Sequence, residues 1–178
     1  IADFSFFTKK NGSSKSHFFY ELDKDLTVKK FDNGDLNFKF QKLSNDTYLK
    51  SNKLKSELIK ENNILENSIN LDLYSNDLSI NLNTTAYEDL DKVNGDRYEY
   101  ILPKLEVAKN IDDLNFLDGN ITIKSTSLIR NYNTNVYEKS NKNDFVFNSN
   151  PIINKYGFFN NYEFLVRNSN SENKNSDH

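Results

Sequence analysis

The sequence predicts an all-β protein, an antiparallel meander of about eight or nine long strands. The first observation is a hairpin in which every second residue is aliphatic over 69–73 and again over 78–83, with a turn at 75–77. Period two places the aliphatic residues on one face of a strand and the polar residues on the other. The second observation is that such runs recur along the chain. The third is that several reach ten residues, longer than the usual length of about five or six.

Composition limits the class of protein. The 178 residues suffice for one medium domain, and the net charge of -3 argues against a nucleic-acid partner, which would require a clustered basic face. Only 36 % of the residues are hydrophobic, but 14 Phe and 10 Tyr supply large apolar side chains inside the alternating runs. Cysteine is absent, so neither disulfides nor thiolate metal sites are expected. Methionine is absent even at position 1, so we expect an internal piece of a longer protein.

In the first half of the chain, alternation predicts strands at 2–8, 16–22, 36–41, 64–74 and 78–87. Asn33 and Gly34 predict a tight turn before the third of these, because this dipeptide tolerates the positive φ of a type I′ turn. Residues 44–53 are polar and predict a loop. Within 54–63, Leu54, Leu58 and Ile59 have the spacing of a short helix.

In the second half, strands are predicted at 97–108, 120–131, 145–147 and 158–167. Pro103 should be either a local defect in the ladder of its strand or a sign of an edge strand, because proline cannot donate a hydrogen bond. Connecting segments are predicted at 88–96, 109–118 and 131–142. Residues 168–178 predict a polar loop or tail.

The connections suggest, but do not decide, the environment of the sheet. Tight turns at 32–35 and 75–77 would lie at one end, and the longer connections 44–63 and 88–96 at the other. Short turns opposite longer loops are typical of outer-membrane barrels, although 109–118 departs from this pattern. Soluble sandwiches also carry one apolar and one polar face on each sheet. Pattern alone therefore leaves a membrane barrel and a soluble sandwich open.

Chemistry-bearing residues are few. His17 lies among aromatic residues and His178 is the last residue, so packing and solvent roles are favoured over metal binding or a catalytic triad. Residues 112–119 are only loosely similar to a calcium loop, because Leu117 occupies a position that needs an oxygen ligand. Four Asn-x-Ser/Thr sequons are expected by chance among 30 asparagines, at Asn11, Asn45, Asn83 and Asn120. We therefore expect no enzyme activity, no cofactor and no metal.

Three segments carry a family resemblance. They are QKLSNDTYLK at 41–50, YEDL at 87–90 followed by DRYEYILP at 96–103, and YGFFNNYEFLVRNSNS at 156–171. In order and spacing they resemble the outer-membrane lipopolysaccharide-assembly protein family, LptD, also called OstA or organic-solvent-tolerance protein. The first is similar to a strand end and its Ser-x-Asp-x-Tyr loop. The second is similar to the next strand, its loop and a proline-bearing strand, and the third to a later strand with an Asn-rich loop.

The resemblance implies that residues 1–178 form a middle arc of a large outer-membrane barrel in a Gram-negative bacterium, without the periplasmic N-terminal domain and the seam strands. Taken alone, such an arc would be an open, curved sheet with two unpaired edges. The implied function is non-enzymatic insertion of lipopolysaccharide into the outer leaflet. The implied partners are lipopolysaccharide, membrane lipid, a plug lipoprotein in the barrel lumen and periplasmic bridge proteins that act through the absent domain, with no nucleic acid.

Two alternatives stay open: a soluble β-sandwich that binds carbohydrate, or another outer-membrane barrel such as a porin or adhesin translocator. On the barrel reading, alternation divides the side chains between lipid and lumen. The residues predicted to face lipid are Leu36, Phe38, Phe40, Ile69, Leu71, Leu73, Leu78, Ile80, Leu82, Ile121 and Ile123. The residues predicted to line the lumen are Asn37, Lys39, Gln41, Asn70, Asp72, Ser79, Asn81, Asn83, Thr122 and Lys124.

Overall fold

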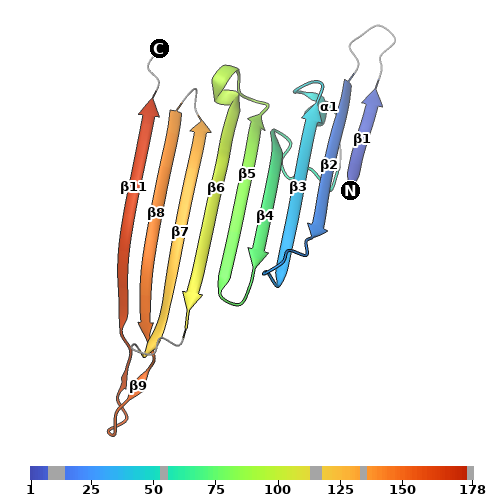
Figure 1. Ribbon diagram of the computed structural model, residues 1–178. Coiled ribbons are helices and arrows are strands. Elements are labelled where there is room, and N and C mark those ends of the chain that lie inside the picture. Colours follow the sequence, from blue (N-terminus) through green and yellow to red (C-terminus); the bar gives the residue numbers. More distant parts are fainter. Residues whose placement is uncertain (8–14, 53–55, 113–117, 133–135, 176–178) are drawn as a thin grey trace.

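The computed structural model describes residues 1–7, 15–52, 56–112, 118–132 and 136–175, most of which belong to one antiparallel sheet. Its nine strands lie in chain order, so each pairs with its neighbour in the sequence of strands (Figure 1). They are β1 (Ala2–Phe7), β2 (Lys15–Asp25), β3 (Asn33–Leu43), β4 (Ile64–Tyr74), β5 (Leu78–Asp89), β6 (Tyr98–Ile111), β7 (Gly119–Tyr132), β8 (Val136–Ser149) and β11 (Glu163–Asn175). The expected all-β antiparallel meander is confirmed.

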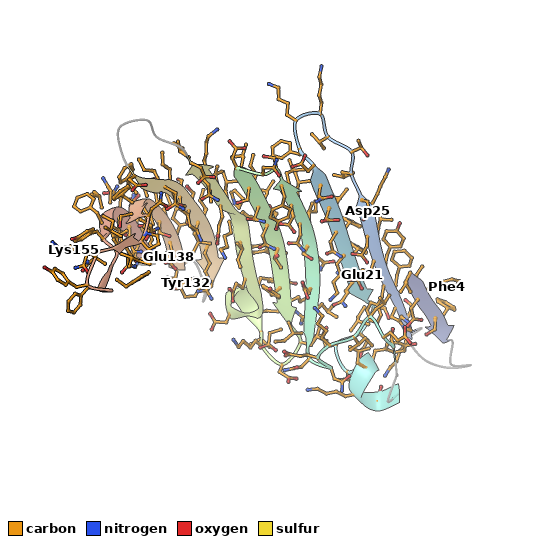
Figure 2. The ribbon with its side chains drawn as sticks, turned by 90° about the horizontal axis from the view of Figure 1, so that it is seen from below. Phe4, Glu21, Asp25, Tyr132, Glu138 and Lys155 are labelled. Carbon is orange, nitrogen blue, oxygen red and sulfur yellow. The ribbon has the colours of Figure 1, made fainter. Side chains whose placement is uncertain are left out.

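The sheet is open. Strands β1 and β11 form its two edges and are not paired with each other (Figure 1). Viewed from below, Phe4 on β1 and Lys155 beyond β8 lie at opposite ends of the molecule, and side chains project from both faces of the sheet (Figure 2). The order of the strands and the free edges agree with the open sheet expected of a partial barrel.

Four short elements lie in the connections. A small hairpin of β9 (Ile152–Ile153) and β10 (Phe159–Asn160) separates β8 from β11. The single-turn helix α1 (Tyr48–Asn52) follows β3, and the 3-10 turn η1 (Asn94–Arg97) precedes β6. Among the described residues, no helix is long and apolar enough to cross a bilayer.

The expected turn at 32–35 is wrong. Residues 26–32 connect β2 and β3, and Asn33 and Gly34 are the first residues of β3. The N–H of Leu26 donates to the Gly34 carbonyl at 2.6 Å, so pairing already begins there. The positive φ that we expected at the Asn-Gly pair falls instead on Lys30, at 80°.

Two predicted irregular segments are strands. Residues 136–142, predicted as part of a polar connection, are the first half of β8, and residues 168–175, predicted as loop or tail, are the second half of β11. Both segments carry polar side chains on both faces, so hydrophobic alternation could not reveal them. The predicted helix within 54–63 is absent from 56–63, where the structure has turns, and the helical turn lies in the segment predicted as loop.

The predicted difference between the two ends of the sheet holds only for the first half of the chain. Strand β7 ends at Tyr132 and β8 begins at Val136, so a short connection lies at the end that carries the long connection 44–63. At the other end, residues 150–162 form a long connection. Loop length therefore does not separate the two ends of the sheet.

Pro103 lies in an interior strand, so the edge interpretation is wrong and the local defect is confirmed. Strand β6 pairs with β5 and with β7 on its two sides, and both ladders shift register next to Pro103. The Leu102–Pro103 peptide bond is cis. A bulge accommodates proline in an interior strand because the ladder does not need its missing N–H there.

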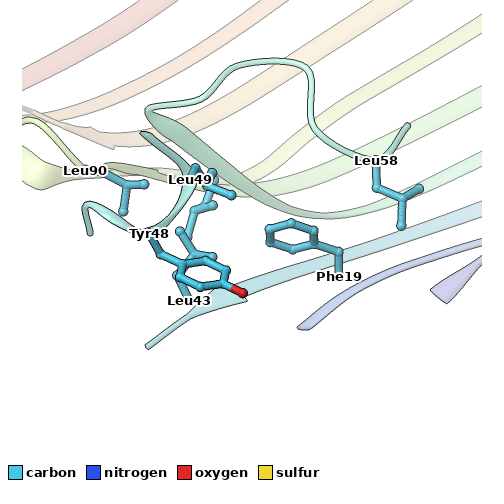
Figure 3. Packing of buried hydrophobic residues seen from close by; sticks show 7 residues of the cluster. Phe19, Leu43, Tyr48, Leu49, Leu58 and Leu90 are labelled. Carbon is cyan, nitrogen blue, oxygen red and sulfur yellow. The ribbon is translucent and has the colours of Figure 1, made fainter. Parts of the chain in front are cut away.

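The buried apolar core is confined to one end of the sheet, where residues 44–52 and 56–63 pack beside β2 to β4 (Figure 3). Its members are Phe19, Leu43, Tyr48, Leu49, Leu58, Leu65 and Leu90. In the part of the chain that the structure describes, Ile121 is the one buried apolar side chain outside this cluster. Most of the sheet therefore lacks a packed second layer among these residues.

Candidate membrane-facing band and polar face

The pairing of the strands divides the predicted site residues cleanly between two faces. On one face, Leu36 lies opposite Leu71, and Leu71 lies opposite Leu82. On the other, Asn70 lies opposite both Asn37 and Asn83. The pairing places all eleven residues predicted to face lipid on the first face, the apolar face, and all ten predicted lumen residues on the second, the polar face. Contact with lipid or with a lumen stays a prediction.

The apolar face is larger than predicted. The same pairing adds Phe4, Phe18, Leu22, Leu105, Val107, Phe145, Phe147, Phe164 and Val166. Aromatic side chains contact one another across β2 and β3: the ring centroids of Phe18 and Phe40 lie 6.0 Å apart, and those of Tyr20 and Phe38 lie 6.1 Å apart. Alternation in the sequence at 105–107, 145–147 and 164–166 was a usable signal for most of these additional positions.

Much of the apolar face is exposed. The exposed fraction is 75 % for Phe4, 46 % for Ile69 and 59 % for Phe164. Single exposed apolar residues are ordinary, but a contiguous apolar surface across a whole sheet marks a contact with protein or membrane. This surface is the principal candidate for function.

The apolar residues form a band that crosses the strands diagonally. We call residues directly opposite one another on successive strands a row. The row through the centre of the band on β4 becomes polar from β7 onward: Leu36, Leu71, Leu82, Leu105, Ser127, Asn141, Asn170. The row through Leu78 changes in the opposite direction, from polar to apolar. It contains Lys109 on β6 and then the apolar residues of β7, β8 and β11, which are Ile123, Phe145 and Val166. The band therefore slopes relative to the hydrogen-bonding direction.

The slope can be estimated from the pairing. The row from Leu71 on β4 reaches Asn141 on β8, which lies about five residues from the midpoint of the apolar pair Phe145 and Phe147. With a rise of ~3.3 Å per residue and a spacing of ~4.8 Å between strands, four strand steps give a slope of about 40°. The lower strand ends in Figure 1 descend in the same direction from β4 to β7. A band perpendicular to the axis of a barrel requires a strand tilt of this size.

Amide side chains connect the strands across the polar face. Asn37 donates from Nδ2 to Asp23 at 2.5 Å and accepts at Oδ1 from Asn70 at 3.1 Å. Asn83 in turn donates to Asn70 Oδ1. This chain of hydrogen bonds runs from β2 to β5. A polar face of this kind is suited to water or to a polar partner, since each amide keeps further donor and acceptor capacity.

A cavity of about 380 Å³ opens on the polar face above β3 to β6. Its floor holds an ion pair in which Lys39 Nζ lies 3.0 Å from Glu66 Oε2, with the two side chains 5 % and 25 % exposed. The other lining residues include Gln41, Lys60 and Tyr87. Cations and carboxylates are mixed around the cavity, so it does not select one sign of charge.

His17 is buried in a hydrogen-bonded cluster at the β1 edge. Its Nδ1 lies 3.0 Å from Ser5 Oγ and its Nε2 lies 3.2 Å from Asp3 Oδ1, while the ring stacks on Phe19 at 4.7 Å. Ser5 Oγ also lies 2.5 Å from the Tyr48 hydroxyl. The packing role predicted for His17 agrees with this burial. His17 of β2 and Tyr48 of α1 both contact the Ser5 hydroxyl of β1, so the cluster links β1 and α1 to β2.

Ion pairs fasten the two connections at the core end of the sheet. Arg97 donates from Nη1 and Nη2 to the Asp46 carboxylate at 2.7 and 2.6 Å, and from Nε to Glu88 at 2.9 Å. The hydrogen bonds from Arg97 hold the pKa of Asp46 below its usual range. Lys50 bonds Asp91 and lowers the pKa of that carboxyl in the same way. Sequence reasoning did not find these contacts, because Asp46 and Arg97 are 51 residues apart.

No metal or cofactor site follows from the described residues. No group of three or more His, Asp or Glu side chains within those ranges is placed to hold a metal ion. Residues 113–117 of the segment compared with a calcium loop, the sequon residue Asn11, and His178 lie outside the described residues.

Comparison with known proteins does not assign a family. No protein-family model, no curated protein and no solved structure matches this chain. Function is therefore inferred from the two faces of the sheet, the slope of the apolar band and the contacts among the family-like segments.

Proposed function

We propose that this chain is an arc of a Gram-negative outer-membrane barrel whose function is the non-catalytic insertion of lipopolysaccharide into the outer leaflet. The observation that carries the barrel part of the proposal is the exposed apolar band with its slope of about 40°. In this arrangement the band faces lipid, and the polar face meets a wet lumen.

The slope and the exposure of the band together favour a barrel over a soluble sandwich. In a sandwich, each apolar sheet face is covered by a second sheet about 10 Å away. Here the larger sheet holds nine strands, and the second sheet of the described residues is the short hairpin β9–β10. Tilted strands in a membrane barrel place the apolar residues of successive strands at shifted positions along the chain, as this band does.

The choice of lipopolysaccharide assembly among outer-membrane barrels is supported by the family-like segments. The first segment supplies Asp46 and the second supplies Glu88 and Arg97, and these three side chains form one ion cluster. Two of the three segments that resemble the family thus meet in one contact. On this proposal the partners are lipopolysaccharide, membrane lipid, a plug lipoprotein against the polar face, and periplasmic bridge proteins that act through an N-terminal domain outside this chain.

The barrel part is tested by labelling, which the absence of cysteine simplifies. Single-cysteine variants Leu71→Cys and Ile80→Cys report on the apolar face, and Asn70→Cys and Asn81→Cys are matched controls on the polar face. The parent protein is refolded into phospholipid vesicles, and each variant carries a nitroxide at the introduced cysteine. We expect the first pair to be accessible to dissolved oxygen and the second pair to a water-soluble nickel complex. A chain that is monomeric and unfolds cooperatively in water, with equal accessibility at all four positions, would contradict the proposal.

The lipopolysaccharide part needs a separate test. In the source bacterium, the parent protein is depleted and newly made lipopolysaccharide at the cell surface is measured by protease-independent surface labelling. We expect it to fall while the inner-membrane pool rises. Unchanged surface lipopolysaccharide, with membrane insertion intact, would favour a porin or an adhesin translocator.

A further inference from the structure

The apolar face of β7, β8 and β11 changes character between two adjacent rows. The last apolar row is Ile123, Phe145 and Val166. The next two rows consist of Ser125, Asn143, Asn168 and of Ser127, Asn141, Asn170. We call these six residues the amide field. The field continues the surface of the band without a step, because all of its side chains lie on the same face of the same three strands.

The side chains of the amide field are ordered by one another. Ser125 Oγ donates to Asn143 Oδ1 at 2.8 Å, Asn143 Nδ2 donates to Asn141 Oδ1 at 2.5 Å, and Asn141 Nδ2 donates to Ser127 Oγ at 2.8 Å. On β11, Asn170 donates to Asn168 at 2.8 Å. A primary amide has two N–H donors and two acceptor lone pairs, so these bonds use about half the capacity of Asn141 and Asn143. The remaining donors and acceptors are preoriented for an external ligand.

A hollow of about 370 Å³ lies on this part of the sheet. Ser127, Asn141 and Asn170 of the amide field line it together with the next row outward, Ile129, Lys139 and Glu172. The charges that line the hollow are one cation and one anion opposite each other, with no excess of either sign. The hollow offers neutral donors and acceptors beside an aliphatic side chain.

We propose that the amide field binds the sugar head groups of glycolipids in the leaflet that surrounds this end of the band. This inference rests on the proposed function, because it needs the band to lie in a bilayer. The two rows lie about 7 Å apart along the strands, which is comparable to the thickness of the polar layer next to the hydrocarbon core. The field lies on the side of the band away from the turn 75–77, and it faces the leaflet on the side where β7 ends and β8 begins.

The chemistry of the field selects sugar over phospholipid head groups. Neighbouring hydroxyls of a sugar are both donors and acceptors, and a primary amide matches such a pair with one N–H and one carbonyl oxygen. A phosphate group would require cations, and the two rows of the field contain none. A surface of neutral amides next to a bilayer is therefore complementary to a polyhydroxylated head group.

The test uses the parent protein refolded into vesicles, with the lipid-free core oligosaccharide released from lipopolysaccharide as the probe. Binding is followed through the backbone amide signals of Ser125, Ser127 and Asn170 in heteronuclear spectra, because these residues of the field are unchanged in every variant. Asn141→Leu combined with Asn143→Leu should weaken binding about tenfold or more, since each substitution removes hydrogen bonds to the sugar. Thr126→Leu is the matched control, because Thr126 lies at the same depth on the opposite face and should leave binding unchanged.

The outcomes separate this inference from the proposed function. Insertion into vesicles is measured independently by protease protection. Insertion without oligosaccharide binding, equal loss in the control variant, or competition by inorganic phosphate at equal concentration would each overturn the sugar assignment while the barrel stands. Failure to insert would overturn the barrel and this inference with it. Oligosaccharide binding by a chain that stays soluble would instead identify a carbohydrate-binding sandwich and would also overturn the assignment to a membrane leaflet.

Discussion

The side chain of Gln41 replaces main-chain pairing with Glu66. The ladder between β3 and β4 ends at Lys39 and Ser68, and beyond it Gln41 Oε1 accepts from the Glu66 N–H at 2.8 Å. Gln41 Nε2 also donates to the Leu58 carbonyl at 2.6 Å, which ties the connection between the strands to the same point. One buried amide thus closes the place where two adjacent strands separate.

Gln41→Leu should therefore cost about 2 kcal/mol, because the substitution leaves the partly buried Glu66 N–H and the buried Leu58 carbonyl without partners. The local measurement is amide hydrogen exchange at Glu66, which should become faster by more than the global loss of stability explains. Lys42→Leu is the control, because Lys42 is exposed on the next position of the same strand. Equal exchange at Glu66 in both variants would show that the side chain does not replace the ladder.

Arginine substitutions within one row test the slope of the band. Leu71 and Asn141 belong to the same row, yet the slope places Leu71 at the centre of the band and Asn141 beyond its border. In bilayers, Leu71→Arg should destabilise the parent barrel by about 2–4 kcal/mol, and Asn141→Arg by roughly 0–1 kcal/mol. Asn70→Arg, on the polar face, should also cost much less than Leu71→Arg. The measurement is reversible unfolding from vesicles, and equal costs at Leu71 and Asn141 would remove the slope.

Acid should release the connection 44–52 from the connection that precedes β6. Hydrogen bonds from Arg97 and Lys50 lower the pKa values of Asp46 and Asp91, so both carboxylates stabilise the fold above the ordinary aspartate pKa of about 4. That stabilisation is lost as the pH falls through the lowered values. The Asp46 side chain is 49 % exposed, so solvent screens its ion pair with Arg97. The loss of stability at low pH should therefore be local and modest.

The measurement for this acid response is the exchange rate of the Leu49 and Leu90 amides between pH 6 and pH 2. The acid-dependent increase should be absent from the double variant Asp46→Asn with Asp91→Asn, which already lacks the charges. An acid response of the same size in that variant would assign the effect to other carboxylates.

The ion pair of Lys39 and Glu66 should behave as a coupled unit. Lys39→Met leaves the Glu66 carboxylate without its cation and should cost about 2–3 kcal/mol, somewhat less than for a fully buried pair because Glu66 keeps contact with solvent. Adding Glu66→Gln should recover part of this loss, a coupling that a double-mutant cycle measures. Lys104→Met, in the more exposed pair with Glu106, should cost well under 1 kcal/mol by comparison. Additive losses at Lys39 and Glu66 would show that the pair contributes nothing specific.

Sequence reasoning was accurate where alternation was strict. The hairpin predicted at 64–74 and 78–87 is observed as β4 and β5 with one boundary two residues longer, because aliphatic and small polar side chains alternate strictly over 69–73 and 78–83. It failed at 136–142 and 168–175, where both faces are polar and the strands are maintained by cross-strand pairing that no local pattern reveals. The lists of the two faces agreed with the pairing because they were drawn from strictly alternating segments.

Contacts between distant segments were beyond the reach of the sequence pattern. Three sets of contacts depend on which strands become neighbours. They are the ion pairs of Arg97 with Asp46 and Glu88, the hydrogen bonds of the Gln41 side chain, and the cluster of Ser5, His17 and Asp3. Polar residues alone could not indicate these pairs, since Asp, Asn, Glu and Lys occur throughout the chain. The amide field was missed for a related reason: its asparagines are informative only after the row that they share is known.

The polar halves of β7, β8 and β11 have a mechanical consequence for the proposed barrel. On β7 the chain continues from Ser125 to Tyr132 beyond the border of the band, whereas on β3 only Gln41, Lys42 and Leu43 follow Phe40. With a rise of ~3.3 Å per residue and the slope estimated above, β7 would stand roughly 20 Å above the lipid and β3 well under half of that. The rim of such a barrel would therefore be built unevenly: paired strands alone form it at β7, whereas at β3 the packed residues 44–52 and 56–63 extend it beyond the strand end.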